Sequence, residues 1–197
     1  MALIPVADGE VATVVTSLEM VARPRPAPLP ESPLRLVRWE RPAPDRYRAL
    51  FRRVGGPWLW FSRLVMRDDA LTAIIHDRAV RIWAVVDRAG IEVGMLELDG
   101  RHAGACELSY VGLVPELAGK GHGRWLMANA LALAWGPGVV RVWVHTCTLD
   151  HPGALAFYRR SGFVPYQRTV ETFPDPRVTG ILPNDAAPHY PLLDSAR

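Results

Sequence analysis

The feature that most constrains this chain is a glycine-rich turn, GKGHGR, at residues 119–124. It separates a strand-like run that ends near residue 114 from a helix-like run, RWLMANALALAW, that begins at residue 124. Glycines at alternate positions let the backbone approach a ligand without interference from Cβ atoms. A turn that feeds a helix also presents amide N–H groups that lack partners inside the helix, and the helix dipole adds positive potential. The turn therefore predicts an anion site, most often for phosphate.

The segments around this turn predict a single mixed α/β layer fold. Runs with a two-residue period at 80–87, 92–99 and 105–114 are joined by short turns, which favours an antiparallel meander. Further strands are expected at 11–21, 34–39, 139–146 and 163–173. Helices are expected where the apolar period lengthens, at 44–54, 68–76, 124–135 and 152–162. The order indicates a mostly antiparallel twisted sheet flanked by about four helices.

Composition narrows the classes of partner and compartment. The net charge is only +3, and no block of Lys and Arg lies along one face, so nucleic acid is not expected as a partner. No apolar run approaches the roughly 20 residues of a membrane-spanning helix, and the first residues lack the pattern of a signal peptide. Two cysteines, Cys106 and Cys147, cannot form a disulfide framework. We therefore expect a cytoplasmic protein without a membrane partner.

Two common nucleotide motifs do not fit the glycine turn. A Walker loop needs Gly-x-x-x-x-Gly-Lys-Ser/Thr, and that spacing does not occur here. The dinucleotide motif Gly-x-Gly-x-x-Gly would need a glycine where Arg124 stands, and it opens a parallel unit rather than following antiparallel strands. The phosphate ligand must therefore be bound in another way.

Two stretches resemble the GNAT superfamily of N-acetyltransferases. LVPELAGKGHGRWLM resembles the acyl-CoA pyrophosphate loop, Gln/Arg-x-x-Gly-x-Gly/Ala, with Gly121 and Gly123 at the glycine positions and Ala118 where Gln or Arg is usual. HPGALAFYRRSGF resembles Asn-x-x-Ala-x-x-Phe-Tyr-x-x-x-Gly-Phe, with His151 in place of Asn. The residues that match this second motif are Ala154, Phe157, Tyr158, Gly162 and Phe163.

The resemblance implies a GNAT-like domain over residues 34–173, with a sheet that splays between two strands. An N-terminal strand and proline-rich connection at 1–33 and an irregular tail at 174–197 lie outside it, and the tail carries enough apolar residues to pack on the domain. The implied activity is transfer of an acetyl group from acetyl-CoA to a primary amine by direct attack in a ternary complex. Two alternatives stay open, namely an acyl-CoA sensor without turnover and an enzyme that uses another acyl-CoA.

The resemblance also implies which residues bind coenzyme A. The backbone N–H of Leu113 would donate to the acyl carbonyl, and Gly112 could permit a bulge in the strand there. The expected cofactor-binding residues are Leu113, Val114, Ala118, Gly119, Lys120, Gly121, His122, Gly123, Arg124, His151, Ala154 and Tyr158.

Acetyl transfer to an amine needs a base and an acid. An alkylammonium with a pKa near ~10 must lose a proton before it attacks, and the departing thiolate should gain one. Glu107 is the candidate base, with Tyr110 and His145 as alternatives. Strand alternation places Glu107, Ser109 and Val111 on one face and Leu108, Tyr110 and Gly112 on the other. Tyr158 is implied as the general acid.

The acceptor is expected to be a small-molecule or peptide amine. The expected acceptor-binding residues are Trp58, Trp60, Phe61, Tyr110 and His145. A wall of tryptophans suits an amine with an apolar or aromatic body, and it equally suits the contact of a homodimer. Cys147 offers a ping-pong alternative with His145 or His151 activating it, but nothing visible in the sequence lowers the pKa of the thiol, and we do not expect this route. His145, Cys147, Asp150 and His151 also offer a metal site, but the segment begins as a strand and a further ligand would have to come from outside it, so we expect no metal.

Overall fold

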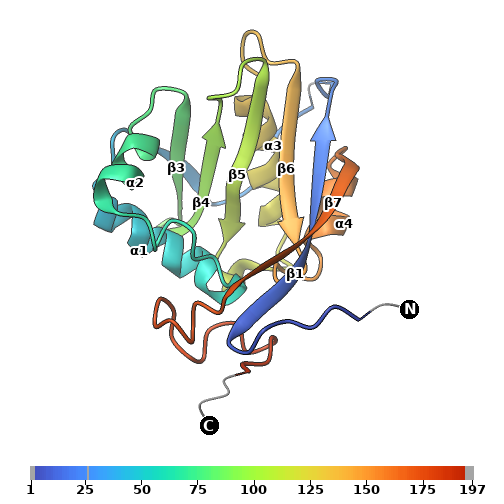
Figure 1. Ribbon diagram of the computed structural model, residues 1–197. Coiled ribbons are helices and arrows are strands. Elements are labelled where there is room, and N and C mark those ends of the chain that lie inside the picture. Colours follow the sequence, from blue (N-terminus) through green and yellow to red (C-terminus); the bar gives the residue numbers. More distant parts are fainter. Residues whose placement is uncertain (1–2, 26, 194–197) are drawn as a thin grey trace.

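The computed structural model describes residues 3–25 and 27–193, and within them one sheet runs through the molecule (Figure 1). Its strands are β1 (Glu10–Met20), β2 (Arg35–Trp39), β3 (Val80–Val86), β4 (Glu92–Asp99), β5 (Ala105–Leu113), β6 (Arg141–Cys147) and β7 (Val164–Pro174). The helices are α1 (Pro44–Gly55), α2 (Asp68–Ile75), α3 (His122–Ala134) and α4 (Ala154–Arg160), with short 3₁₀ turns η1 (Gly56–Trp58) and η2 (Pro115–Leu117). The predicted mixed α/β fold, a mostly antiparallel sheet with four helices among the described residues, is confirmed.

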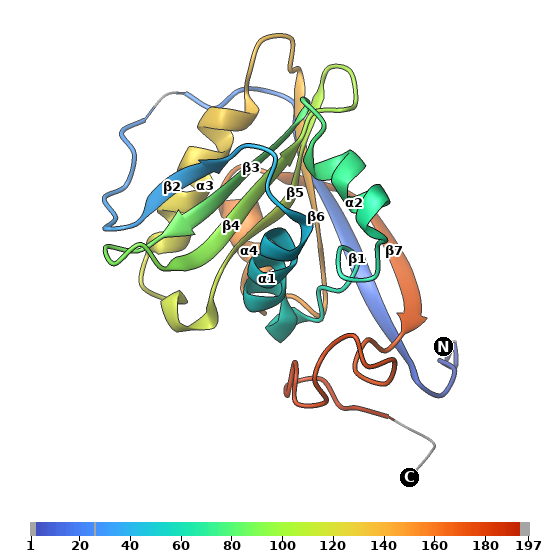
Figure 2. The same ribbon diagram turned by 90° about the vertical axis from the view of Figure 1, so that its left-hand side faces the viewer.

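The strands follow the order β2-β3-β4-β5-β6-β1-β7. Helices α1 and α2 cover one face of the sheet and α3 lies on the other, as Figure 2 shows. The apolar period of each helix explains this burial, because Tyr47, Leu50, Phe51 and Val54 fall on the side of α1 that meets the sheet. No helix in the described part of the chain has the length and apolarity needed to cross a membrane.

The sheet splits between β5 and β6. These two strands run parallel, and they pair only where Ala105–Glu107 lies beside Arg141–Trp143. Beyond Glu107 they separate, and every other strand pair in the sheet is antiparallel. The split therefore opens a gap in the middle of the sheet, on the side where β5 leads into the glycine turn.

Strand β1 lies inside the sheet, although its sequence precedes the segment that resembles the family. It pairs with β6 on one side and with β7 on the other, antiparallel to both. The side chains of Val11 and Leu18 are buried, while β7 forms the edge of the sheet and is exposed along nearly its whole length. The first strand of the chain therefore builds the far half of the sheet together with the last.

A bulge in β5 overturns the simple alternation expected there. Leu108 lies opposite Leu98 and Tyr110 lies opposite Glu97, so Ser109 is an extra residue without a partner on β4. One extra residue reverses which face each later side chain takes. The expected position of the bulge, Gly112, is therefore wrong.

Because of this bulge, Glu107 and Tyr110 point to the same face of the sheet rather than to opposite faces. Glu107 lies opposite Asp99, and Tyr110 lies opposite Glu97, two positions away on β4. Gly112 has a different role, since a Cβ there would lie 2.9 Å from Val54 and 3.3 Å from Trp60. The glycine lets α1 and the segment after it pack closely on β5.

Residues 175–193 pack under the end of the sheet, below β1 and α1 in Figure 1. Buried Arg177 donates to the carboxylate of Asp175 at 2.7 Å and to the carbonyls of Ala186 and Tyr190 at 3.2 and 2.8 Å. These hydrogen bonds hold the segment in place, although it forms no helix or strand. Its apolar side chains join a second small core, whose buried members are Val11, Leu59, Leu149, Leu182 and Ala187.

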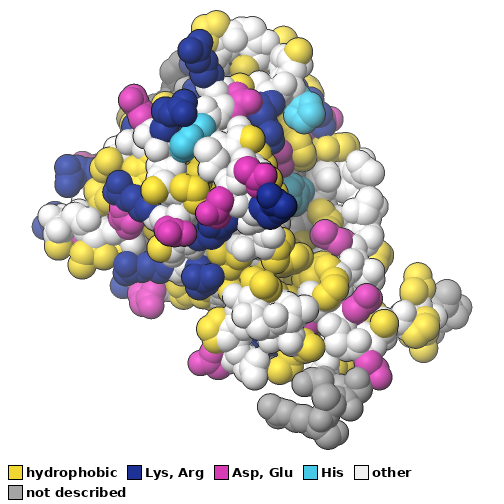
Figure 3. Space-filling model, turned by 60° about the vertical axis from the view of Figure 1, so that its left-hand side comes forward, with side chains coloured by type: hydrophobic (Ala, Val, Ile, Leu, Met, Phe, Trp, Pro, Cys, Tyr) yellow, Lys and Arg dark blue, Asp and Glu magenta, His cyan; other side chains and the backbone are white. Residues whose placement is uncertain are grey.

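Charged side chains on the face that carries α1 and α2 are mixed in sign. In Figure 3, the Lys and Arg side chains of the described residues are interspersed with Asp and Glu. Several are paired, including Arg48 with Asp68 at 2.6 Å and Arg46 with Glu92 at 2.8 Å. This face therefore presents no large patch of one charge.

Candidate active site

A cleft of about 590 Å³ occupies the split between β5 and β6. All five residues predicted to bind the acceptor line it, namely Trp58, Trp60, Phe61, Tyr110 and His145. Most of the residues predicted to bind coenzyme A line it too: Leu113, Val114, Ala118, Gly119, Gly121, Gly123, Arg124, His151, Ala154 and Tyr158. Lys120, His122 and Glu107 lie outside the lining. The two predicted sets therefore meet in one continuous space.

The glycine turn has the backbone geometry that its sequence predicts. Gly119 and Gly121 have φ angles of +73° and +84°, in the left-handed region where L side chains are strained. Gly121 is the N-cap residue of α3, and an added Cβ at either glycine would meet nothing within 4 Å. The turn therefore has open space beside it at the beginning of a helix.

The amide groups of this turn are free to bind a ligand. Ala118 donates its N–H to Pro115 at 2.9 Å and Arg124 donates to Gly121 at 3.1 Å. Between them, none of the amides of residues 119–123 donates to another described residue. Unpartnered amides at a helix N-terminus, beside exposed Arg124, fit a diphosphate group. The residues present are thus compatible with coenzyme A.

The backbone N–H of Leu113 points into the split. Val114 donates its N–H to Val93 on β4 at 2.9 Å. Successive N–H groups along a strand point to opposite sides, so the N–H of Leu113 points away from β4. On that side β6 has already separated from β5. This orientation suits a donor to an oxygen bound in the cleft.

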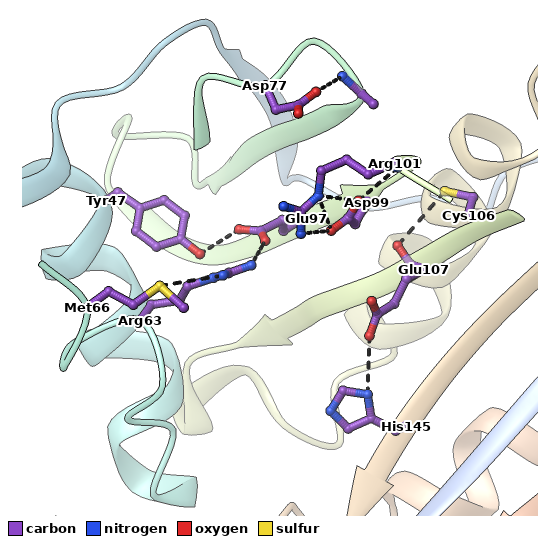
Figure 4. Close-up of polar contacts among 11 residues, drawn as sticks. Tyr47, Arg63, Met66, Asp77, Glu97, Asp99, Arg101, Cys106, Glu107 and His145 are labelled. Carbon is purple, nitrogen blue, oxygen red and sulfur yellow. Dashed lines mark hydrogen bonds and ion pairs between the residues drawn. The ribbon is translucent and has the colours of Figure 1, made fainter. Parts of the chain in front are cut away.

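Glu107 and His145 form a pair at the closed end of the split, as Figure 4 shows. Oε1 of Glu107 lies 3.3 Å from Nδ1 of His145, and the two side chains are 15% and 50% exposed. His145 lines the cleft, whereas Glu107 lies behind it. The hydrogen bond to Glu107 raises the pKa of His145 and outweighs burial, which would lower it.

The hydroxyl group of Tyr158 is placed to keep its proton. Its side chain is buried on α4 and lines the cleft. Burial raises the pKa of Tyr158, and the negative charge of Asp150 adds to the effect. The phenol is therefore neutral at physiological pH and can act as a donor, not as a base.

A buried ionic cluster supports the wall of the cleft, and sequence reasoning missed it. Glu97, fully buried on β4, accepts from Tyr47 at 2.5 Å and from Arg63 at 2.7 Å (Figure 4). The guanidinium of Arg63 lies 5.3 Å from the ring centre of Tyr110, whose hydroxyl is 2.6 Å from Ser62. A charged residue inside the apolar strand MLELD is the one signal that could have indicated a buried carboxylate.

This cluster makes Tyr110 a poor candidate for the base. Burial raises the pKa of Tyr110, outweighing the nearby charge of Arg63. Its ring packs edge-on against Phe51 at 4.8 Å and tilts against Trp60 at 5.2 Å. We infer that Tyr110 shapes the cleft rather than accepting a proton.

Aromatic rings form a further part of the cleft wall. Trp58 lies between His151 and His189, with both ring centres at 5.4 Å, and Phe61 lies 4.8 Å from Phe173 of β7. Thr13 and Val15 of β1 and Glu171 of β7 also line the cleft. Sequence reasoning missed these strand residues, because nothing in the sequence places β1 beside β6.

Cys147 and its neighbours have structural partners. Burial raises the pKa of the Cys147 thiol, which keeps it protonated and unreactive. The carboxylate of Asp150 accepts from Trp60 at 3.1 Å, from Thr146 at 2.7 Å and from the amide of Cys147 at 3.0 Å. Nδ1 of His151 accepts from the amide of Gly153 at 3.0 Å, at the beginning of α4. Across residues 3–25 and 27–193, no three metal-ligating side chains gather in one place.

The profile of the acetyltransferase (GNAT) family matches residues 32–163, well over half of the chain. The chain belongs to the GNAT acetyltransferase family. The matched segment contains strands β2 to β6 and most of the residues that line the cleft, while β1, β7 and the tail lie outside it. No curated protein sequence is significantly similar to this chain.

Solved structures share the fold of this GNAT protein. A GCN5-related N-acetyltransferase from Sphaerobacter thermophilus is similar with a TM-score of 0.57 and 19% identity, over 82% of this chain and 51% of that one. The chain thus spans about half the length of that protein. A GCN5-related N-acetyltransferase from Kribbella flavida gives a TM-score of 0.51 and 16% identity, over 87% and 63%. Spermidine N-acetyltransferase from Vibrio cholerae, in complex with CoA and spermine, gives 0.54 and 25%, over 70% and 84%.

Proposed function

We propose that this protein transfers an acetyl group from acetyl-CoA to a primary amine by direct attack in a ternary complex. The observation that carries the proposal is the cleft itself. At one end are the free amides of residues 119–123, and at the other are the aromatic rings and the Glu107–His145 pair. An acyl donor and an amine can thus meet in one space, as direct transfer requires.

The glycine turn would hold the diphosphate of coenzyme A. The amides from Gly119 to Gly123 supply hydrogen bonds, and Arg124 and Arg160, which also line the cleft, supply positive charge. The arm of the cofactor would lie between β5 and β6, where the N–H of Leu113 would polarise the thioester carbonyl.

Three groups would handle the protons and the developing charge. The pair of Glu107 and His145 would accept the proton of the amine, and Tyr158 would donate one to the departing thiolate. Burial raises the pKa of Tyr158, but a thiolate in the same apolar surroundings is destabilised as well. The proton transfer between them is therefore not made harder by burial alone.

The acceptor end favours a cationic amine with an apolar body. Asp150, which accepts from Trp60, and Glu171 line the cleft and Glu107 lies behind it, while Arg124 belongs to the glycine turn. Negative charge attracts an ammonium group, and the rings of Trp58 and Phe61 offer it apolar and cation–π contacts. Since spermidine is acetylated by the structurally similar Vibrio cholerae enzyme, polyamines belong in the first panel of acceptors.

An acyl-CoA sensor without turnover is the second candidate. Ala118 lacks the side-chain contact that Gln or Arg would make, and His151 is engaged with the amide of Gly153. These two departures from the family pattern favour the sensor, but they remove no backbone donor from residues 119–123.

Thiol release separates the two candidates. Purified protein is given acetyl-CoA with polyamines, arylalkylamines, amino acids or peptides, and free thiol and acetylated product are measured. We expect thiol release with at least one cationic amine, and longer acyl-CoA donors in parallel test the acyl preference. A sensor would show a rise in melting temperature with acetyl-CoA but no product from any amine.

A further inference from the structure

We infer that His145 is the group that takes the proton from the amine, and that Glu107 acts through it as a positioning residue. This inference rests on the proposed function and assigns the two members of the pair their separate roles. It differs from the expectation that Glu107 itself is the base.

The sheet register fixes the relation between the two residues. Glu107 is the last residue of β5 that pairs with β6, and its partner there is Trp143. His145 follows two positions later, so it points to the same face as Trp143 and Glu107. At His145, β6 has no β5 neighbour, and the imidazole lines the cleft. Glu107 remains behind it, in the part of the sheet that is still closed.

Exposure supports the same division of roles. The side chain of Glu107 is 15% exposed and that of His145 is 50% exposed. Glu107 is not among the residues that line the cleft, so an amine that enters the cleft meets the imidazole first. A base must come within hydrogen-bond reach of the proton it removes, and His145 is the member that meets this condition.

The contact also sets the tautomer of the imidazole. Oε1 of Glu107 lies 3.3 Å from Nδ1 of His145, and a carboxylate at that distance favours a proton on Nδ1, which would leave the lone pair of Nε2 for the acceptor. The ammonium group first loses one proton to solvent, and Nε2 takes a second proton from the nitrogen as the new C–N bond forms, while Glu107 stabilises the resulting imidazolium. The C–S bond of the thioester breaks, and the thiolate that leaves takes one proton from Tyr158. His145 then returns its proton to solvent and Tyr158 regains one, so that each acetyl transfer from a cationic amine releases one proton overall.

Other acidic groups around His145 also favour its protonated form. Asp150 from the turn after β6 and Glu171 from β7 add negative charge that favours the imidazolium, and β1 places uncharged Ser17 opposite His145. Asp150 is held by Trp60 and Thr146, so it does not compete for the imidazole. Only Glu107 contacts the ring among the acidic groups described.

The test compares His145→Gln and Glu107→Gln, with exposed His102→Gln as the control. The wild-type kcat/KM should rise with pH through a pKa above the ordinary histidine value of about 6.5. His145→Gln should abolish this rise and lower kcat/KM by about 10²–10⁴-fold. Glu107→Gln should keep the rise, shift it to lower pH and lower its plateau. His102→Gln should match the wild type.

A second measurement needs no turnover. The pKa of the His145 ring, followed by NMR of the imidazole in the resting protein, should fall in Glu107→Gln and stay unchanged in His102→Gln. Retention of the acetyl-CoA melting shift shows that each variant is folded. The inference is overturned if His145→Gln keeps the pH-dependent rise or if Glu107→Gln abolishes it. It is also overturned if the His145 pKa does not change in Glu107→Gln. If the wild type acetylates no amine, the proposed function itself fails.

Discussion

The indole ring of Trp60 lies directly against Gly112, so that a Cβ on the glycine would come within 3.3 Å of the ring. The same indole donates its N–H to Asp150 at 3.1 Å, in the turn that follows β6. Trp60 therefore joins the two sides of the split, with β5 beneath it and the turn after β6 beside it. The position of this one ring determines the shape of the acceptor end.

Gly112→Ala should disturb the acceptor end and leave the coenzyme end intact. The added methyl group overlaps Val54 and Trp60, which should cost about 1–3 kcal/mol of unfolding free energy. Displacement of Trp60 should lower kcat/KM for the amine at least tenfold, since about 1 Å of misplacement can cost on the order of 10²-fold. Calorimetry should give an unchanged Kd for coenzyme A. Gly136→Ala is the control, because a Cβ there meets nothing within 4 Å. Equal amine kinetics in both variants would contradict the prediction.

Gly121→Ala should weaken coenzyme A binding through the backbone alone. Its φ of +84° is unfavourable for alanine, so the variant should lose about 1–2 kcal/mol of stability or turn its amides away from the ligand. Gly138→Ala is a matched control, with a φ of +76° and equally open space. Both variants should melt at similar temperatures, but only Gly121→Ala should raise the Kd, by about tenfold or more. An equal Kd for the two would mean that the turn does not bind the diphosphate.

Tyr158→Phe should reduce turnover without reducing affinity. The phenylalanine keeps the packing against Phe163 and removes only the hydroxyl group. The rate constant with saturating substrates should fall about 10²-fold or more, since that is the usual contribution of a general acid. Exposed Tyr166→Phe should behave as the wild type. A parallel rise in the Kd for acetyl-CoA would instead make Tyr158 part of the binding wall.

Arg177→Ala should destabilise the protein more than a surface pair does. Removing Arg177 leaves the buried carboxylate of Asp175 without its partner, at a cost of about 3–5 kcal/mol. Arg67→Ala breaks the exposed contact with Asp69 and should cost about 0–1 kcal/mol. Urea unfolding at neutral pH measures both values. A loss below about 1 kcal/mol for Arg177→Ala would contradict the structural role of the pair.

The same pair has a defined dependence on pH. Burial by itself would raise the pKa of Asp175, but the hydrogen bonds from Arg177 outweigh it and hold the pKa below its usual range. A depressed pKa stabilises the fold above the unfolded value of about 3.9, and this stability is lost as the pH falls through the folded value. The difference in stability between the wild type and Arg177→Ala should therefore shrink in acid.

Much of the fold could be predicted because it depends on local patterns. The two-residue periods of β3, β4 and β5 and the glycines before α3 mark their elements directly in the sequence. The register of the residues within those strands could not be predicted. The bulge at Ser109 inserts one residue and leaves no mark in the sequence, yet it moves Tyr110 to the face of Glu107.

The site was most directly predictable where a short motif carries it, and the five residues expected at the acceptor also line the cleft. The residues of the glycine turn and of α4 could be named from their spacing, whereas Thr13, Glu171 and Arg63 could not. Thr13 and Glu171 come from strands that meet only through the long-range pairing of the sheet, and Arg63 comes from the loop before α2 and is held there by Glu97 on β4. The packing of the tail could not be predicted either. Arg177 donates to the carbonyls of Ala186 and Tyr190, and no local pattern in the sequence indicates where those carbonyls lie.

The position of β1 between β6 and β7 has a consequence for synthesis of the chain. During translation β1 leaves the ribosome first, but the two strands that pair with it leave last. Until then, Val11 and Leu18 have no core to enter, and both backbone edges of β1 lack partners. The nascent protein therefore lacks the far wall of its cleft until β7 has been made.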